Sequence, residues 1–244
     1  MAYKSKLLLL ILTAILLAVA LPFFIDITWH AWFIIPLACY ITKGFGSEIG
    51  THRLFTHRSF NTNNFWKKIM IALQTISGEG SIIGFVGVHR LHHQHSDTEK
   101  DPHCPSKGIL RTTFYQHEVN NFDVRLIKDL FNEPWLVTQH KKYFLIQIII
   151  MTLLLLISPL VLWYYSVNII STLWINFLVN VVCHRWGTND NNLPNNSKNN
   201  RWADIFLLGV GLHNNHHLHP GASNLAWPPY KFDIWAKIIG LIKQ

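Results

Sequence analysis

The chain has few charged residues and few cysteines. Only 14% of its 244 residues are Asp, Glu, Lys or Arg, whereas about 25% is usual for a soluble domain. So little charge argues against a disordered chain, a basic tail or a coiled coil. The cysteines argue against a disulfide framework and against a zinc ribbon, because they are odd in number and have no paired spacing. They are Cys39, Cys104 and Cys183.

Hydrophobic residues and histidines are abundant instead. Half of the residues are hydrophobic, 15 are histidines, and the formal net charge is +8. A chain with this little charge and this much apolar surface is most simply a membrane protein. Because histidine is too polar for a surface that faces lipid, the histidines are expected to gather away from the bilayer core.

Four largely uncharged stretches have the length of membrane spans. They lie at about 7–25, 27–46, 143–163 and 166–186, and each is close to the roughly 20 residues that cross a hydrocarbon core of about 30 Å. The prediction is an all-α integral membrane protein with four transmembrane helices in two hairpins, forming one domain over 1–244. A cleaved signal peptide within the first 20 residues is an alternative, because Lys4 and Lys6 precede an apolar run.

Lysine and arginine indicate the orientation. All 21 lie within 1–6, 43–142 and 185–244, and short cytoplasmic loops carry an excess of these residues. Both termini and the segments 47–142 and 187–244 are therefore predicted to be cytoplasmic and to form a histidine-rich helical domain. Within it, residues 65–88 are expected to form one helix at the membrane interface, since charges and glycines interrupt the stretch.

Three histidine clusters have the spacing of metal ligands. Residues three or four apart share one face of a helix, so two of the clusters can each reach an ion from one side. The pair His52 and His57 is five apart, a rotation of about 140°, and shares an ion only if the helix bends or ends between them. The clusters are His52 with His57, His89 with His92 and His93, and His213 with His216 and His217.

A ninth histidine, His184, ends the fourth predicted span. Asn180 lies four residues earlier on the same face, where a polar residue at membrane depth is costly unless it faces a site. Nine imidazoles are too many for one ion and suit two. Imidazole binds iron, copper, nickel and zinc, so the spacing predicts a two-metal site without naming the metal.

The motifs around these histidines resemble those of the membrane-bound fatty acid desaturases, in particular the bacterial acyl-lipid or acyl-CoA delta-9 type. The histidine spacing matches the family's H-x4-H, H-x2-HH and H-x2-HH pattern, with an extra histidine after the fourth span. The matching segments are Gly50–Phe60, His89–Asp97 continuing to His103, and His213–Pro220. The resemblance extends over essentially the whole chain.

The resemblance implies a di-iron enzyme that uses O2 and two external electrons to introduce a cis double bond, at the delta-9 position, into a lipid-bound or CoA-bound acyl chain. The electrons would come from a separate ferredoxin or cytochrome b5. All nine histidines would be iron ligands, with Asn180 acting through a water molecule. One iron would take His52, His57, His89 and His93, the other His92, His184, His213 and His217, while His216 is assigned to neither.

Two other functions stay open at this stage. The same scaffold can carry a fatty acyl hydroxylase, and histidine clusters can also belong to a metal-binding membrane protein without redox activity. One departure from the family is Val210, at a position where the family usually has glutamate. The residues expected to fix the orientation of the ligand rings are Asp97, Asp101, His103 and Asp204, with Glu48 and Glu79 as further candidates.

Overall fold

The computed structural model describes residues 3–114, 123–207, 209–228 and 232–244, and these are mainly helical. The helices are α1 (Tyr3–Ala20), η1 (Leu21–Phe23), α2 (Ala31–Cys39), η2 (Tyr40–Thr56), α3 (Asn64–Ser77), α4 (Ile82–His95), η3 (Pro105–Lys107), α5 (Ile109–Phe114), η4 (Val124–Asn132), α6 (Pro134–Ile157), α7 (Pro159–Asn180), η5 (Val182–His184), α8 (Arg201–Leu207), α9 (His213–Leu218) and α10 (Ile234–Ile242).

Three helical segments are long and apolar enough to cross a membrane. They are Tyr3–Phe23, Pro134–Ile157 and Pro159–His184, and they overlap the first, third and fourth predicted spans. The break between the last two lies at Ser158, earlier than the predicted turn between 163 and 166, which falls inside α7. Large apolar side chains stand exposed along them, including Leu16 and Leu156, as expected of surfaces that face lipid. The second predicted span, 27–46, is the short helix α2 continuing into η2, and it is not among the three. The chain is therefore a helical membrane protein.

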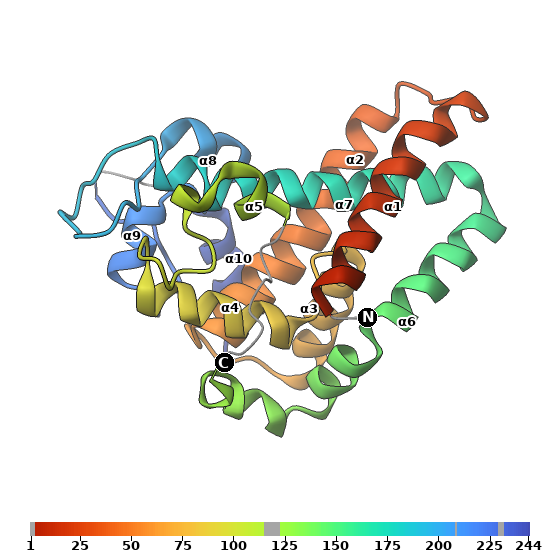
Figure 1. The fold of residues 1–244 in the computed structure, drawn as a ribbon. Helices are drawn as coiled ribbons and strands as arrows, with labels where there is room; N and C mark the ends of the chain where they lie inside the picture. The colour runs from red at the N-terminus through yellow and green to blue at the C-terminus, as the bar shows by residue number, and fades with distance from the viewer. Residues whose placement is uncertain (1–2, 115–122, 208, 229–231) are drawn as a thin grey trace.

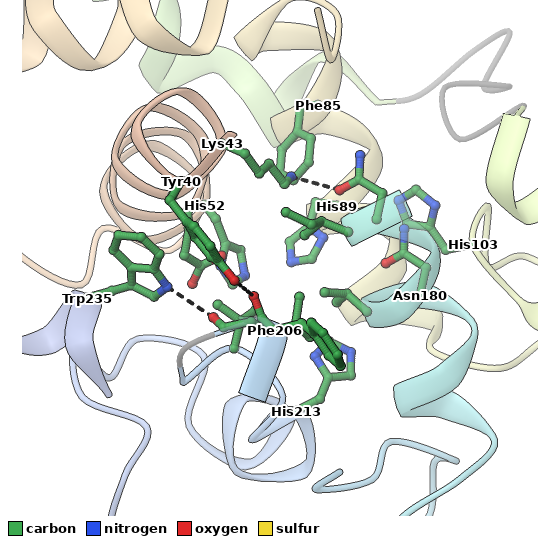
Figure 2. Close-up of a pocket in the computed structure, with 17 residues that line it drawn as sticks. Tyr40, Lys43, His52, Phe85, His89, His103, Asn180, Phe206, His213 and Trp235 are labelled. Atoms are coloured by element: carbon green, nitrogen blue, oxygen red, sulfur yellow. Dashed lines mark hydrogen bonds and ion pairs between the residues drawn. The ribbon is translucent and has the colours of Figure 1, made fainter. Parts of the chain in front are cut away.

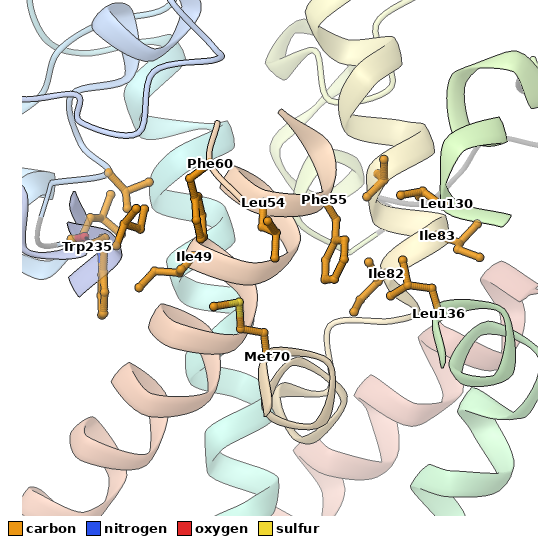
Figure 3. Close-up of a cluster of buried hydrophobic side chains, with 14 of the residues drawn as sticks. Ile49, Leu54, Phe55, Phe60, Met70, Ile82, Ile83, Leu130, Leu136 and Trp235 are labelled. Atoms are coloured by element: carbon orange, nitrogen blue, oxygen red, sulfur yellow. Dashed lines mark hydrogen bonds between the residues drawn. The ribbon is translucent and has the colours of Figure 1, made fainter. Parts of the chain in front are cut away.

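Helix α7 joins the apolar part of the molecule to the part that carries the histidines. In Figure 1, α1, α2, α6 and the first half of α7 lie at one end, and α7 runs from there to α8 and α9 at the other. One apolar cluster packs α1 and α6 against α7. A second, shown in part in Figure 3, gathers side chains from η2, α3, α4, α7, α8 and α10. Because α7 contributes to both clusters, the position of the histidines is tied to that of the apolar helices.

Helix η2 is wound as a π-helix, which is wider than an α-helix and closes its hydrogen bonds over five residues. Its glycines allow close packing. A Cβ on Gly44 would lie 2.0 Å from the Trp235 ring, and one on Gly46 would lie 2.4 Å from the backbone nitrogen of Gln74 in α3. The missing side chains therefore let α3 and α10 approach the backbone of η2, and they fix its position in the core.

The stretch 65–88 is not the single helix that its composition predicted. Helices α3 and α4 meet at an angle of 86° across a four-residue break, where Gly78 has a φ of +77°. Side chains of α6 satisfy the interrupted backbone: the Tyr143 hydroxyl accepts from the Gly80 nitrogen at 2.9 Å, and Gln139 Oε1 accepts from the Ile82 nitrogen at 3.1 Å. Such support is needed where irregular backbone lies away from water.

Candidate metal centre

Four separate helices bring the nine histidines together. The end of η2 carries His52 and His57, α4 carries three, η5 carries His184, and α9 carries three. The five-residue step between His52 and His57 is closed by a hydrogen bond from the His57 nitrogen to the His52 carbonyl at 3.1 Å. This is the bond of a π-helix, and it brings two side chains to one side that would diverge on an α-helix.

The first group of rings contains His216. One ligand atom from each of His52, His57, His89 and His216 lies within 4.8 Å of the others. His93 adjoins the same group, because its Nε2 atom lies 3.1 Å from that of His89 and 2.9 Å from that of His216. The first group thus comprises five imidazoles, including the one histidine that the sequence assigned to neither ion.

The second group contains the four histidines that the resemblance to the desaturases places together. Ligand atoms of His92, His184, His213 and His217 all lie within 4.8 Å of one another. The Nε2 atoms of His184 and His213 are 2.9 Å apart, and those of His92 and His217 are 3.3 Å apart. Two ligands that bind one ion at about 2.1 Å and at a right angle lie about 3 Å apart, so these separations suit a shared metal ion.

Carboxylates contact the Nδ1 atoms of three of the rings. The Nδ1 atom of His92 lies 2.9 Å from Asp101, and that of His184 lies 3.1 Å from Asp97. In the first group, Nδ1 of His52 lies 2.9 Å from Glu48. A ring that donates its Nδ1 proton to a carboxylate keeps a free lone pair on Nε2 when it is neutral. These three lone pairs therefore face the interior of the two groups.

Burial disfavours the protonated form of several of these histidines. Removal from water, reinforced by the neighbouring imidazoles, lowers the pKa of four rings well below the usual value of histidine. These rings are His57, His213, His216 and His217. Burial alone would raise the pKa of the Asp101 carboxyl, but its hydrogen bonds to His92 and to the Asp97 nitrogen, together with its attraction to the nearby rings, outweigh that effect and lower the pKa to about 2. The centre is thus a set of closely spaced ring nitrogens backed by carboxylates, which suits a cation.

One ring nitrogen gives independent evidence for a bound ion. The Nε2 atom of His57 is buried and has no hydrogen-bond partner. A buried polar atom without a partner is costly, and native proteins rarely contain one. Because this atom lies among the ring nitrogens of the first group, a metal ion would satisfy it. The residues present therefore fit metal ions.

An asparagine-rich loop, residues 188–200, packs over the second group and α9. The backbone nitrogen of Asn196 donates to Asp97 at 2.7 Å, which secures the carboxylate that holds His184. Asn191 donates to Asn214 and Asn215, and Asn215 also accepts from Asn199 at 2.8 Å. Both asparagines of α9 are buried, so the loop fixes the short helix that carries three histidines.

The remaining candidate residues lie at different distances from the rings. Asn180 is buried and lines the same pocket as His213. His103 is buried with its ring centroid 5.5 Å from that of His92, and its backbone nitrogen donates to Asp101. Asp204 binds the backbone nitrogens of Gly209 and Gly211, so it shapes the turn before α9.

Glu79 and Lys43 form a buried ion pair that the sequence did not predict. The Lys43 ammonium also donates to Asn176 at 2.7 Å, and it lies over the ring of Phe85. The Phe85 ring is in turn stacked on His89 at 5.4 Å. Glu79 is thus linked to the first group through Lys43 and Phe85, and it also accepts a hydrogen bond from Ser47 of η2. The pair could have been anticipated from sequence, because a lysine in a predicted span requires a partner.

A pocket adjoins the ring nitrogens of both groups. His52, His89 and His213 line it, and Figure 2 shows them around it together with Tyr40, Phe206 and Trp235. Most of its other walls are apolar or aromatic. They include Phe85, Ile175, Val179, Phe206, Leu207, Val210 and Trp235. Val210, at the position of the family's glutamate, therefore contributes an apolar side chain to this wall.

A helical membrane protein with nine imidazoles in two groups and an apolar pocket has the features of the histidine-rich membrane proteins that can bind metal ions. Comparison with known sequences identifies the family within that class. The sequence profile described as "Fatty acid desaturase" matches residues 27–237, most of the chain. The protein belongs to the membrane fatty acid desaturase family and is an oxidoreductase that acts on fatty acyl chains.

Individual relatives agree on the reaction but not on the substrate. The chain is 34% identical to the sn-1 stearoyl-lipid 9-desaturase of Anabaena variabilis, over 79% of this chain and 73% of that protein. It is 28% identical to the enzyme of the same name from Synechocystis sp., over 89% and 72%. An acyl-CoA C20 Delta5-desaturase of Anemone leveillei is also 28% identical, over 78% and 64%. Relatives thus differ in carrier and in double-bond position.

Proposed function

We propose that the protein is a di-iron acyl desaturase that places a cis double bond at the delta-9 position. The observation that supports this most directly is the division of nine imidazoles into two groups. Iron ions bound there would supply the oxidant needed to attack an unactivated C–H bond, which acid–base groups cannot do. Two hydrogens leave adjacent methylene groups, and O2, two electrons and two protons are consumed as two water molecules form.

The proposal assigns five histidines to one iron and four to the other. His52, His57, His89, His93 and His216 would hold one iron, and His92, His184, His213 and His217 the other. Glu48, Asp97 and Asp101 would hold their rings in the ligating tautomer, since each lies within 3.1 Å of a ring Nδ1 atom. Asn180 would act on the second iron through a water molecule, and its place in the pocket wall supports that role.

The apolar pocket would bind the acyl chain. Its walls exclude water from the reacting carbons, and its shape would set which methylene groups lie beside the ring nitrogens. The delta-9 position is supported by the names of the two cyanobacterial relatives, which act at that carbon.

The topology belongs to the same proposal. We infer one domain with four spans in two hairpins, in which α2 and the first part of η2 form the second span. The distribution of lysine and arginine supports a cytoplasmic location for both termini and the metal centre. Electrons would come from a separate ferredoxin or cytochrome b5.

Expression in a host that lacks its own acyl desaturase tests the function. We expect new monounsaturated fatty acids with the double bond at carbon 9, located by mass spectrometry. His93→Ala should abolish them, whereas the matched control His95→Ala, which removes a histidine outside both groups, should retain them. Hydroxy acids would instead indicate the hydroxylase. Saturated lipids alone, from protein that contains iron, would contradict the proposal.

A further inference from the structure

A buried arginine, Arg53, lies next to the first group of rings. It follows His52 in η2, and its side chain is 2% exposed. Its Nε atom donates to Glu48 Oε1 at 2.9 Å, and its Nη1 atom donates to Asp233 Oδ2 at 2.8 Å. The guanidinium therefore joins two buried carboxylates, one in η2 and one that lies 180 residues later in the chain.

Glu48 contacts both a ring of the first group and the guanidinium. Its Oε2 atom lies 2.9 Å from Nδ1 of His52, while its Oε1 atom accepts from Arg53. On an α-helix, residue 53 would be rotated by about 140° from residue 48. In the π-helix η2 a turn closes over five residues, so His52 and Arg53 both lie one turn beyond Glu48. Because both oxygens of the carboxylate are engaged, Arg53 fixes the orientation in which Glu48 meets His52.

Arg53 is itself held by the C-terminal part of the chain. Its Nη2 atom donates to Asp233 Oδ1 at 3.3 Å, and its Nη1 atom also donates to the Ser223 carbonyl at 2.7 Å. A guanidinium that contacts both oxygens of a carboxylate is fixed in angle as well as in distance. Asp233 in turn accepts from the backbone nitrogens of Leu225 and Ala236, both at 3.0 Å. Arg53 thus meets a carboxylate whose own position is fixed.

Helix α10, which Asp233 caps, is anchored at both ends. Near its start, the Trp235 ring packs against Gly44 of η2, and its ring nitrogen donates to the Leu207 carbonyl at 3.2 Å. At its end, the Thr62 hydroxyl donates to the Ile242 carbonyl at 2.7 Å. The helix is therefore a fixed support for Asp233, and through Arg53 for Glu48.

The other two carboxylates that contact rings are held by the backbone. Asp101 accepts from the backbone nitrogens of Asp97 and His103, both at 2.7 Å, and Asp97 accepts from that of Asn196. Glu48 is held instead by the side chain of Arg53. A backbone nitrogen remains in place when a side chain is replaced, whereas the support of Glu48 depends on particular side chains.

We propose that Arg53 and Asp233 are positioning residues for the first metal ion, and that the series Asp233, Arg53, Glu48 and His52 sets the orientation of the His52 ring from α10. The inference rests on the proposed function, because it requires the first group to bind iron. Nε2 of His52 lies 3.1 Å from that of His216, so rotation of the His52 ring would change the separation of two ligand atoms. Loss of either positioning residue should therefore weaken iron binding at the first site, although neither would touch the ion.

Titration of each site separately tests the proposal. The variants His213→Ala and His216→Ala are expected to retain only the first and only the second site, and metal-free full-length protein of each is titrated with ferrous iron in detergent. Asp233→Asn should lower the affinity of the first site about tenfold, because asparagine still caps α10 but lacks the charge that holds Arg53. The second site should change by less than about twofold. Unchanged affinity at the first site, or equal loss at both, would overturn the inference.

Arg53→Lys is the second variant, and it applies if Asp233→Asn does not fold. Lysine keeps the positive charge but cannot hold two carboxylates at fixed angles, so the first site should again lose affinity, by about fivefold. The matched control is Lys43→Met, which breaks another buried ion pair of η2 and should leave the affinity of the first site unchanged relative to the second. Full affinity in Arg53→Lys, or the same selective loss in Lys43→Met, would contradict the inference.

A double variant separates positioning from a general loss of stability. If Asp233 acts through Arg53 and Glu48, Asp233→Asn should add less than about twofold to the loss of iron affinity that Glu48→Gln causes at the first site. Two independent effects would multiply instead. Full additivity would give Asp233 a role in stability alone and would overturn the inference.

The failure of this inference differs from that of the proposed function. Iron at both sites of the unaltered protein, with a first site that is insensitive to Asp233→Asn and Arg53→Lys, would support the proposed function and overturn the positioning role. A first site that binds no iron in the unaltered protein would contradict the proposed function, and the inference with it.

Discussion

The two histidine groups are built differently. The first has five imidazoles, and among the described residues one carboxylate, Glu48, holds one of its rings. The second has four imidazoles and two such carboxylates, Asp101 and Asp97. The first group therefore depends more on helix geometry, through the π-winding of η2 and the turns of α4. The second is held more by side chains that act on its rings.

This difference has an electrostatic consequence. Two carboxylates behind four rings compensate the charge of a cation better than one carboxylate behind five. We therefore expect the second group to retain its metal longer than the first under a chelator. The predictions below follow the same comparison, beginning with the largest expected effect.

Removal of one ligand from either group should abolish the reaction. His213→Ala in the second group and His216→Ala in the first should each lower product formation by at least about a hundredfold, because both ions would be needed to activate O2. Product is measured as monounsaturated fatty acid in the desaturase-deficient host. Normal product from His216→Ala would remove that residue from the first group.

Asp101→Ala should weaken the second group selectively. Loss of a carboxylate that orients a ligating histidine typically costs 10–100-fold in metal affinity, so we expect about that loss at the second site alone. Titration of metal-free protein with ferrous iron measures it. Asp129→Ala is the control, because Asp129 pairs with Arg58 and Arg90 rather than with a ring. Equal loss at both sites would mean that the groups are not independent.

Glu48→Gln should have a smaller effect, limited to the first group. Glutamine still accepts a hydrogen bond from His52 but lacks the charge, and the other four rings of the group keep their present contacts. We expect about a tenfold loss of iron affinity at the first site. A loss of iron affinity confined to the second site in the same titration would show that Glu48 supports the second group and not the first.

Lys43→Met should leave the ratio of metal between the two sites unchanged while lowering stability. Removal of one member of a buried ion pair leaves the other charge without a partner and typically costs about 3 kcal/mol. Thermal unfolding in detergent measures the loss. The double variant Lys43→Met with Glu79→Gln should recover part of it, since the unpaired carboxylate is then absent. Loss of metal from the first site alone would instead show that the Lys43–Glu79 pair supports metal binding there.

The sequence predicts the second group better than the first. The division implied by the resemblance places the same four rings together as the second group, and spacings of three and four residues on α4 and α9 put the rings of each helix on one face. These spacings are local, and an α-helix fixes the geometry. The resemblance to the desaturases identified the family, which the comparison with known sequences confirms.

The features that the sequence missed depend on tertiary packing. The five-residue step of His52 and His57 left their convergence open, because π-winding is set by the packing of η2 against α3 and α10. The 86° break at Gly78 is stabilised by Tyr143 and Gln139 of α6, which are distant in sequence. The position of His216 depends on how α9 docks onto η2. No local pattern carries that information.

The central claim, that two distinct histidine groups each hold one iron, is tested most directly by the iron content of the purified protein. We expect two iron atoms per chain after iron-replete expression, and one in each of the variants His213→Ala and His216→Ala. Zinc in place of iron, one iron in the unaltered protein, or loss of both irons from a stably folded single variant would contradict the claim.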